Sequence, residues 1–192
     1  MSRIRSLRPN VTREEAVEQF SPAGPAGAFR RLVFGPLRSV ADFYIPFRLF
    51  QVEVSNAGKP DKRILGLEAV VGSLDLYRFE QIPGSSEIIS VETRNHPESR
   101  LDDARAHELV VDKFRRALYS EGFFRMRDLS ITATPLPGDL HIPYWVGFRG
   151  SGARAQVFVI DAVRRQLEGA KVRDLLQNWL TGPPAAVLQG RQ

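Results

Sequence analysis

The stretch FYIPFRLFQVEV, residues 43–54, shapes our expectation of the fold, because its opening recurs in LHIPYWVGFRG at residues 140–150. In each copy an Ile-Pro-aromatic step starts a strand-like run, and alternation of apolar and polar residues is typical of a β-strand. Pro lacks a backbone donor, so it suits the first residue of a strand or an edge. Ile45-Pro46-Phe47 and Ile142-Pro143-Tyr144 therefore predict two strands that open alike.

Further matches flank these strands in the same order. Phe29-Arg30-Arg31 matches Phe114-Arg115-Arg116, and Glu68-Ala69-Val70 lies beside Asp161-Ala162-Val163. An ordered set of matches indicates an internal duplication. We therefore predict an α+β protein of two pseudo-repeated units, each a helix packed on antiparallel strands, with a C-terminal amphipathic helix.

The loops suggest how the chain is divided. Residues 1–11 contain Arg3, Arg5 and Arg8 and are expected to form a basic flexible arm. The remaining segments are a first α+β unit at 12–97, a second α+β unit with the C-terminal helix at 98–182, and a loose tail at 183–192.

Local signals predict the individual elements. Thr12 and Glu15 form a capping-box pattern that starts a helix at about Arg13. Apolar spacing of three and four residues predicts the best helix at about 104–124. The other predicted helices cover 28–34 and 171–180, and the predicted strands cover 47–54, 63–71, 74–82 and 86–94 (a hairpin around Pro83-Gly84), then 128–136, 141–148 and 153–160.

The second unit, ending in YWVGFRGSGARAQVFVIDAVRRQLEG, resembles a PepSY-type repeat. In that repeat a helix packs on a hairpin whose last strand ends in a similar Asp-Ala turn. The first half resembles it more weakly. The chain departs from the family pattern because Arg164-Arg165 replace the usual Gly after the turn, and because the typical secretion signal is missing. The resemblance implies a role in binding or restraining peptidases outside the cytoplasm.

Bulk composition is that of a globular protein, with 43% hydrophobic and 26% charged residues. The chain has no Cys, which removes disulfides, zinc–thiolate sites and Cys nucleophiles. No secretory signal follows the basic start, and no apolar run approaches the length of a transmembrane span. We therefore predict a cytoplasmic location and no transmembrane segment.

The chain carries a net charge of +5, and 23 of its 27 basic residues are Arg. Two interpretations are open: codon bias of a GC-rich genome, and an anionic partner bound by guanidinium groups. Under the second interpretation, four single arginines could add to the anion-binding surface: Arg125, Arg127, Arg149 and Arg154. The candidate anion-binding residues are three pairs: Arg30, Arg31, Arg115, Arg116, Arg164 and Arg165.

No motif predicts catalysis. His107-Glu108 begins like a zinc helix, but Val111 stands where the second His is needed. His141 starts a strand without an adjacent nucleophile. His96, Glu98, Asp102, Asp103 and His107 crowd one stretch, which is consistent either with a divalent ion or with a polar loop before a helix N-terminus. We favour the second interpretation and predict no catalytic residue, no metal and no cofactor.

The remaining signal is a surface for partners. Leu175 and Trp179 lie on the apolar edge of the last predicted helix, which either docks on a partner or covers its own sheet. We predict a soluble accessory or protein-interaction module without catalytic activity, whose partner is an unknown protein. The alternative is nucleic-acid binding through the paired arginines. A homo-oligomer is compatible with the sequence, and membrane-surface binding by the Arg-rich apolar residues 29–50 is less favoured.

Overall fold

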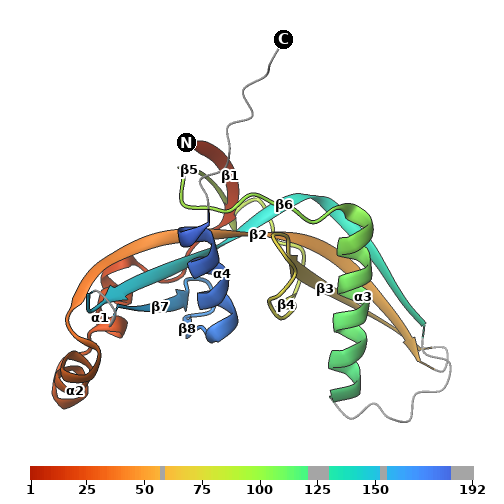
Figure 1. Cartoon of the computed structure of the whole chain (residues 1–192). Helices are drawn as coiled ribbons and strands as arrows, with labels where there is room; N and C mark the ends of the chain where they lie inside the picture. Colours follow the sequence, from red (N-terminus) through yellow and green to blue (C-terminus); the bar gives the residue numbers. More distant parts are fainter. Residues whose placement is uncertain (57–58, 121–129, 152–154, 183–192) are drawn as a thin grey trace.

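The computed structural model describes residues 1–56, 59–120, 130–151 and 155–182, and these form an α+β fold (Figure 1). Within these ranges the elements are β1 (Ser2–Leu7), α1 (Arg13–Phe20), α2 (Pro25–Phe34), β2 (Leu37–Asn56), β3 (Lys59–Glu68), β4 (Tyr77–Phe79), β5 (Ile88–Thr93), α3 (Asp103–Ser120), β6 (Ser130–Arg149), β7 (Gln156–Asp161), β8 (Gln166–Leu167) and α4 (Ala170–Thr181).

One mixed sheet runs through both halves of the chain. Strands β2 and β6, each 20 residues long, pair antiparallel from Leu37–Arg149 to Ser55–Ser130. The strand order is β4-β3-β2-β6-β1-β5, with β7 and β8 branching from β6. Strand β1 is parallel to β6 and antiparallel to β5. The two repeated openings meet in this ladder, because Ile45 lies opposite Ile142.

Strand β2 contributes side chains to two core clusters. The β2–β6 register shifts between Arg48 and Phe50. Before the shift, buried odd-numbered side chains from Phe43 to Leu49 enter one core cluster. After it, Phe50 and the even-numbered residues to Val54 enter a second cluster. Successive side chains of a strand point to opposite faces, and the β2–β3 register is unbroken from Phe47 to Asn56, so the two clusters lie on opposite faces of β2.

The helices cover three clusters along the arched sheet. Helices α1 and α2 lie under one end of the arch, α3 under the other end, and α4 between them (Figure 1). Val110 and Phe114 of α3 pack on β2 and β3, whereas Leu176 of α4 packs on the middle strands. Phe20 of α1 packs on Ile160 of β7.

Several sequence predictions are confirmed. The α+β class holds, and α1 begins at Arg13 with a complete capping box, in which the Glu15 amide donates to the Thr12 hydroxyl at 3.2 Å. Helix α3 begins at Asp103, and the last helix spans Ala170–Thr181. Helix α2 starts three residues before its expected position, because Pro25 occupies the first helical turn, where Pro is tolerated.

Three expectations are wrong. The first residues do not form a flexible arm: β1 pairs with β5 and β6, and Ile4 and Leu7 are buried. The expected hairpin of 74–82 with 86–94 does not form, because β4 pairs with β3 and β5 pairs with β1. The two strands expected at 128–136 and 141–148 are one strand, β6, that continues through the expected turn. The expected tail at 183–192 lies outside the described residues.

Candidate functional site

The first candidate site is a groove of about 720 Å³ beside α4, called the α4 groove below. Four segments form it: the start of β1, the turn after β3, the loop between β5 and α3, and the outer part of α4. Its lining residues are Ser2, Val70, Val71, Arg94, His96, Pro97, Glu98, Arg100, Leu175, Asn178, Trp179, Leu180 and Gly182.

Backbone hydrogen bonds fix the walls of the α4 groove. The buried Glu68 carboxylate accepts hydrogen bonds from the backbone N–H groups of Val70, Val71 and Ser73, the last two at 2.7 and 2.8 Å. These bonds hold the turn that carries Val71 into the groove. The opposite loop is tied to the same turn, because the Arg100 amide donates to the Ala69 carbonyl at 2.9 Å.

The α4 groove combines exposed apolar surface with cations. Val71 is 56% exposed and Leu180 is 49% exposed. Arg94 and Arg100 are exposed, and no carboxylate of the described residues pairs with either guanidinium. Glu98 is the acidic side chain among the lining residues. The groove therefore suits a ligand with apolar and acidic groups.

The two residues expected to bind a partner have different surroundings. Leu175 is buried and belongs to the central core cluster. Trp179 packs on Phe43, with ring centroids 4.9 Å apart, and also lines the α4 groove. Helix α4 therefore covers its own sheet, while its Trp179 edge faces the groove.

The second candidate site is a cleft of about 470 Å³ beside α3, called the α3 cleft below. It lies between α3, the segment that joins β3 to β4, and the start of α4. Its lining residues are Leu65, Asp75, Leu76, Arg78, Lys113, Phe114, Arg116, Ala117, Ser120 and Lys171. Four of these are cationic and one is acidic, and this sets the chemistry of the cleft.

The cations of the α3 cleft are held in different ways. Lys171 Nζ pairs with Asp75 Oδ1 at 2.6 Å. Lys113 Nζ donates to the Leu74 carbonyl at 2.8 Å, and Arg116 Nε donates to the Asp112 carbonyl at 3.3 Å. Burial lowers the pKa of Lys113; Asp75 opposes this, and the nearby cations Lys171 and Arg116 add to it.

The three arginine pairs do not form one surface. Arg31 is exposed on α2, which lies at the opposite end of the arch from α3 (Figure 1). The Arg30 side chain is outside the described part of the structure. On α3, Arg115 pairs with Asp112 at 3.4 Å, whereas Arg116 lines the α3 cleft.

The third pair lies at the turn between β7 and β8. The Arg164 guanidinium stacks 3.4 Å from the Tyr77 ring centroid and donates to the Arg78 carbonyl at 3.1 Å. Arg165 lies 3.6 Å from a carboxylate oxygen of Glu15. The third pair therefore binds groups of its own chain.

Of the other basic candidates, Arg149 is buried. Its guanidinium donates to the carbonyl of Gly35 at 2.8 Å and to the carbonyl of Phe20. Arg149 therefore ties β6 to the ends of α1 and α2, and is enclosed by its own chain. Arg125, Arg127 and Arg154 lie outside the described residues.

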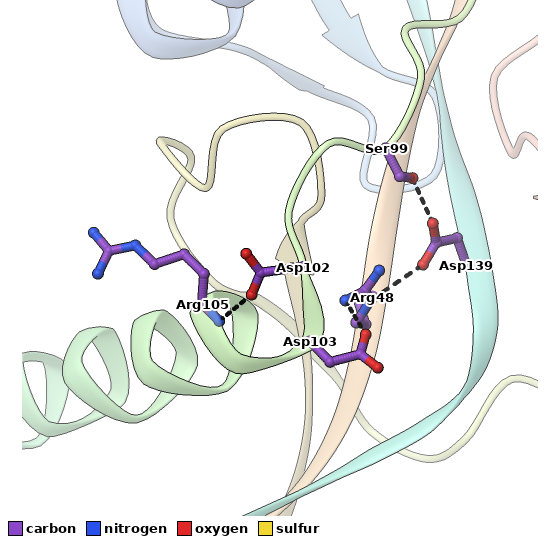
Figure 2. Close-up of polar contacts among 6 residues, drawn as sticks. All are labelled: Arg48, Ser99, Asp102, Asp103, Arg105 and Asp139. Atoms are coloured by element: carbon purple, nitrogen blue, oxygen red, sulfur yellow. Dashed lines mark hydrogen bonds and ion pairs between the residues drawn. The ribbon is translucent and has the colours of Figure 1, made fainter.

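A polar junction joins β2, β6 and the start of α3 (Figure 2). Arg48 Nη1 pairs with Asp103 Oδ1 at 2.7 Å, and Arg48 Nε lies 3.5 Å from Asp139 Oδ1. Ser99 Oγ donates to the other carboxylate oxygen of Asp139. Each charged side chain of the junction has a partner within it, so the junction serves as a structural contact.

The residues weighed as metal ligands were His96, Glu98, Asp102, Asp103 and His107. Asp102 Oδ1 accepts the Arg105 amide at 2.7 Å at the start of α3, as the helix N-terminus interpretation predicts (Figure 2). His96 packs edge-on against His141, with ring centroids 5.5 Å apart, and burial lowers the pKa of His141. Among the described residues, no group of three or more His, Asp or Glu is placed to hold a metal ion.

Sequence reasoning missed most of the groups that share these sites. Arg94 and Arg100 of the α4 groove lie in a loop without a motif, and Lys113, Arg78 and Lys171 come from three distant segments. Of the residues singled out in the sequence, His96, Glu98, Leu175 and Trp179 line the α4 groove, and Arg116 lines the α3 cleft.

Comparison with known proteins finds no protein-family model, curated protein or solved structure that matches this chain. In the described part of the chain, no helix is both long enough and apolar enough to cross a membrane.

Proposed function

We propose that this chain is a non-catalytic interaction module that binds a segment of a partner protein in the α4 groove. The observation that carries the proposal is the pairing of exposed apolar side chains, Val71 and Leu180, with Arg94 and Arg100, which have no carboxylate partner among the described residues. A segment that presents acidic and apolar side chains would complement both. Charge complementarity of this kind selects partners and speeds association.

Trp179 is the proposed anchor of the interface. Aromatic side chains in preformed pockets often carry much of the binding energy of an interface. Phe43 already fixes one side of the Trp179 ring, so little side-chain freedom is lost when a partner covers the rest.

The alternative, a nucleic acid bound by the arginine pairs, has less support. Arg31 and Arg116 lie at opposite ends of the arch, and Arg115 and Arg165 have carboxylates of their own chain within 4 Å (Figure 1). A continuous cationic track of the kind that follows a phosphate backbone is therefore not built from these pairs. Nucleic acid remains the second candidate, tested below.

We also propose that the two halves arose by duplication of one helix-plus-hairpin unit. The Ala69 amide donates to the Pro46 carbonyl at 2.9 Å, and the Ala162 amide donates to the Pro143 carbonyl at 3.0 Å. In both copies the acidic residue before this Ala accepts N–H groups of the turn that follows. The resemblance to the PepSY-type repeat is part of the same proposal and supports a binding role.

The proposal is tested by affinity capture with matched variants of the full chain. The wild type, the double variant Arg94→Glu/Arg100→Glu and the control Arg13→Glu are each immobilised and exposed to host lysate. Arg13 is exposed at the start of α1 and does not line the groove. We expect one protein retained by the wild type and the control and lost by the double variant, because charge reversal would repel an acidic segment.

Nuclease treatment of half the lysate separates the two candidates. A partner that survives nuclease and depends on the two arginines supports the groove. A partner retained equally by all three proteins contradicts it. If no protein is retained after nuclease treatment, nucleic acid is favoured as the partner. If the immobilised chain retains a second copy of itself, the chain self-associates.

A further inference from the structure

We infer that the α3 cleft is a binding site for a small organic phosphate that carries an apolar body. Lys113 and Arg116 would bind the phosphate head, and Leu76 and Ala117 would contact the body. This site is separate from the α4 groove and shares no lining residue with it.

The charge of the α3 cleft is the first argument. Lys113, Arg116 and Lys171 line a space that contains one carboxylate, Asp75, and Lys171 already pairs with it. Gathering like charges in a concave surface costs free energy, which an anion in the same space offsets. A phosphate monoester, which carries nearly two negative charges at neutral pH, matches this excess better than a carboxylate does.

The donors are placed for an anion. Lys113 Nζ has three hydrogens, and the carbonyls of Leu74 and Ser73, at 2.8 and 3.5 Å, account for at most two of them. Arg116 donates from Nε to its own helix, and no described carboxylate pairs with its terminal nitrogens. A fork of guanidinium N–H groups beside an ammonium is a suitable geometry for phosphate oxygens.

The environment of Lys113 supports the same interpretation. Burial lowers the pKa of its ammonium, and two nearby cations add to this effect. An anion bound beside Lys113 would stabilise its charged form.

The size and apolar wall of the α3 cleft favour a small molecule. A volume of about 470 Å³ falls within the usual range of small-ligand sites. The wall contains Leu65, Leu76, Phe114 and Ala117, of which Leu76 and Ala117 are half-buried. Inorganic phosphate would leave this wall unused, so an apolar body should add affinity.

The test is isothermal titration of the full chain with phenyl phosphate, inorganic phosphate and benzoate at low salt. We expect saturable binding of phenyl phosphate with a Kd at or below about 1 mM, and weaker binding of the other two probes. Arg116→Gln and Lys113→Gln should each weaken phenyl phosphate binding at least about tenfold, because each removes a charged donor.

The matched control is Arg105→Gln, which changes an exposed residue of the same helix that pairs with Glu108 and does not line the cleft. The affinity of the Arg105→Gln variant for phenyl phosphate should equal that of the wild type. Thermal unfolding of each variant checks the fold, and Lys171→Gln provides a third cleft variant if one of the others unfolds.

Three results would overturn the inference. One is the absence of saturable phenyl phosphate binding, and another is equal weakening by the Arg105 and Arg116 variants. The third is tight, Arg116-dependent binding of an oligothymidylate without binding of phenyl phosphate, which would assign the cleft to a nucleic acid. Because the α4 groove is tested with other variants, either proposal can fail alone.

Discussion

Replacing Glu68 by Gln should destabilise the protein by about 3 kcal/mol. The side chain is fully buried, and its two carboxylate oxygens accept the N–H groups of Val70, Val71 and Ser73. Gln keeps one acceptor oxygen and has an NH2 group in place of the other. At least one of the three backbone N–H groups would then face this NH2 donor and lose its acceptor. An unsatisfied buried donor costs about 1–3 kcal/mol, and the remaining bonds lose the benefit of a charged acceptor.

The assay is equilibrium unfolding in urea. With a slope of about 2 kcal/mol per molar, a loss of about 3 kcal/mol moves the midpoint down by about 1.5 M. Glu80→Gln, at an exposed position, is the control and should leave the midpoint unchanged. If Glu68→Gln moves the midpoint by less than about 0.3 M, the three hydrogen bonds do not stabilise the turn as argued.

Three further perturbations test other parts of the structure. Gly147→Ala should lower the free energy of unfolding by about 1–3 kcal/mol, because an added Cβ would lie 2.8 Å from the Phe20 ring; a thermal melt equal to the wild type would disprove this close contact. Burial raises the pKa of Asp161 above 3.8, so its protonated form is favoured in the folded state and stability is lost as pH rises through the raised pKa. Asp161→Asn should therefore gain stability relative to the wild type as the pH rises above 3.8, and a difference in unfolding free energy that is the same at every pH would contradict this. Trp179→Ala should cost about 2 kcal/mol by removing the packing on Phe43, whereas an unchanged melting temperature would mean that the ring packs on Phe43 too weakly to stabilise the fold.

Local signals in the sequence predicted local structure well. The capping box of α1 depends on two side chains three residues apart, and the structure forms both of its bonds. Helices α3 and α4 follow from the spacing of apolar residues within one segment. The order of hydrophobic and polar residues is sufficient here because each helix satisfies its own backbone hydrogen bonds.

Strand partners could not be predicted in the same way. Strand β1 carries two Arg, Arg3 and Arg5, and its sequence resembles a solvated arm, yet Ile4 between them is buried against the sheet. Strands β4 and β5 follow each other along the chain but do not pair. Strand β4 pairs with β3, and β5 pairs with β1, because the arrangement of the whole sheet determines the partners. Sheet hydrogen bonds join distant residues, so local sequence does not determine which strands pair.

The candidate sites show the same limit. The Phe-Arg-Arg repeat drew attention to Arg115 and Arg116 together, but helix geometry turns neighbouring side chains about 100° apart. Only Arg116 lines the α3 cleft, and its cationic neighbours there come from other elements. Arg149, a further basic candidate for anion binding, is buried, and its guanidinium donates to backbone carbonyls.

The long β2–β6 ladder has a consequence for synthesis on the ribosome. Strand β2 ends at Asn56, and its partner β6 begins at Ser130. The edge of β2 that pairs with β6 therefore stays unpaired until the residues between them and β6 itself have been synthesised. At about 5–20 residues per second this wait lasts several seconds, and only the shorter β3 pairs with β2 locally. A nascent chain that stalls in this interval would expose a long unpaired strand edge, which is a template for aggregation. We therefore expect chaperones to protect this chain during synthesis, although the folded protein has this edge paired.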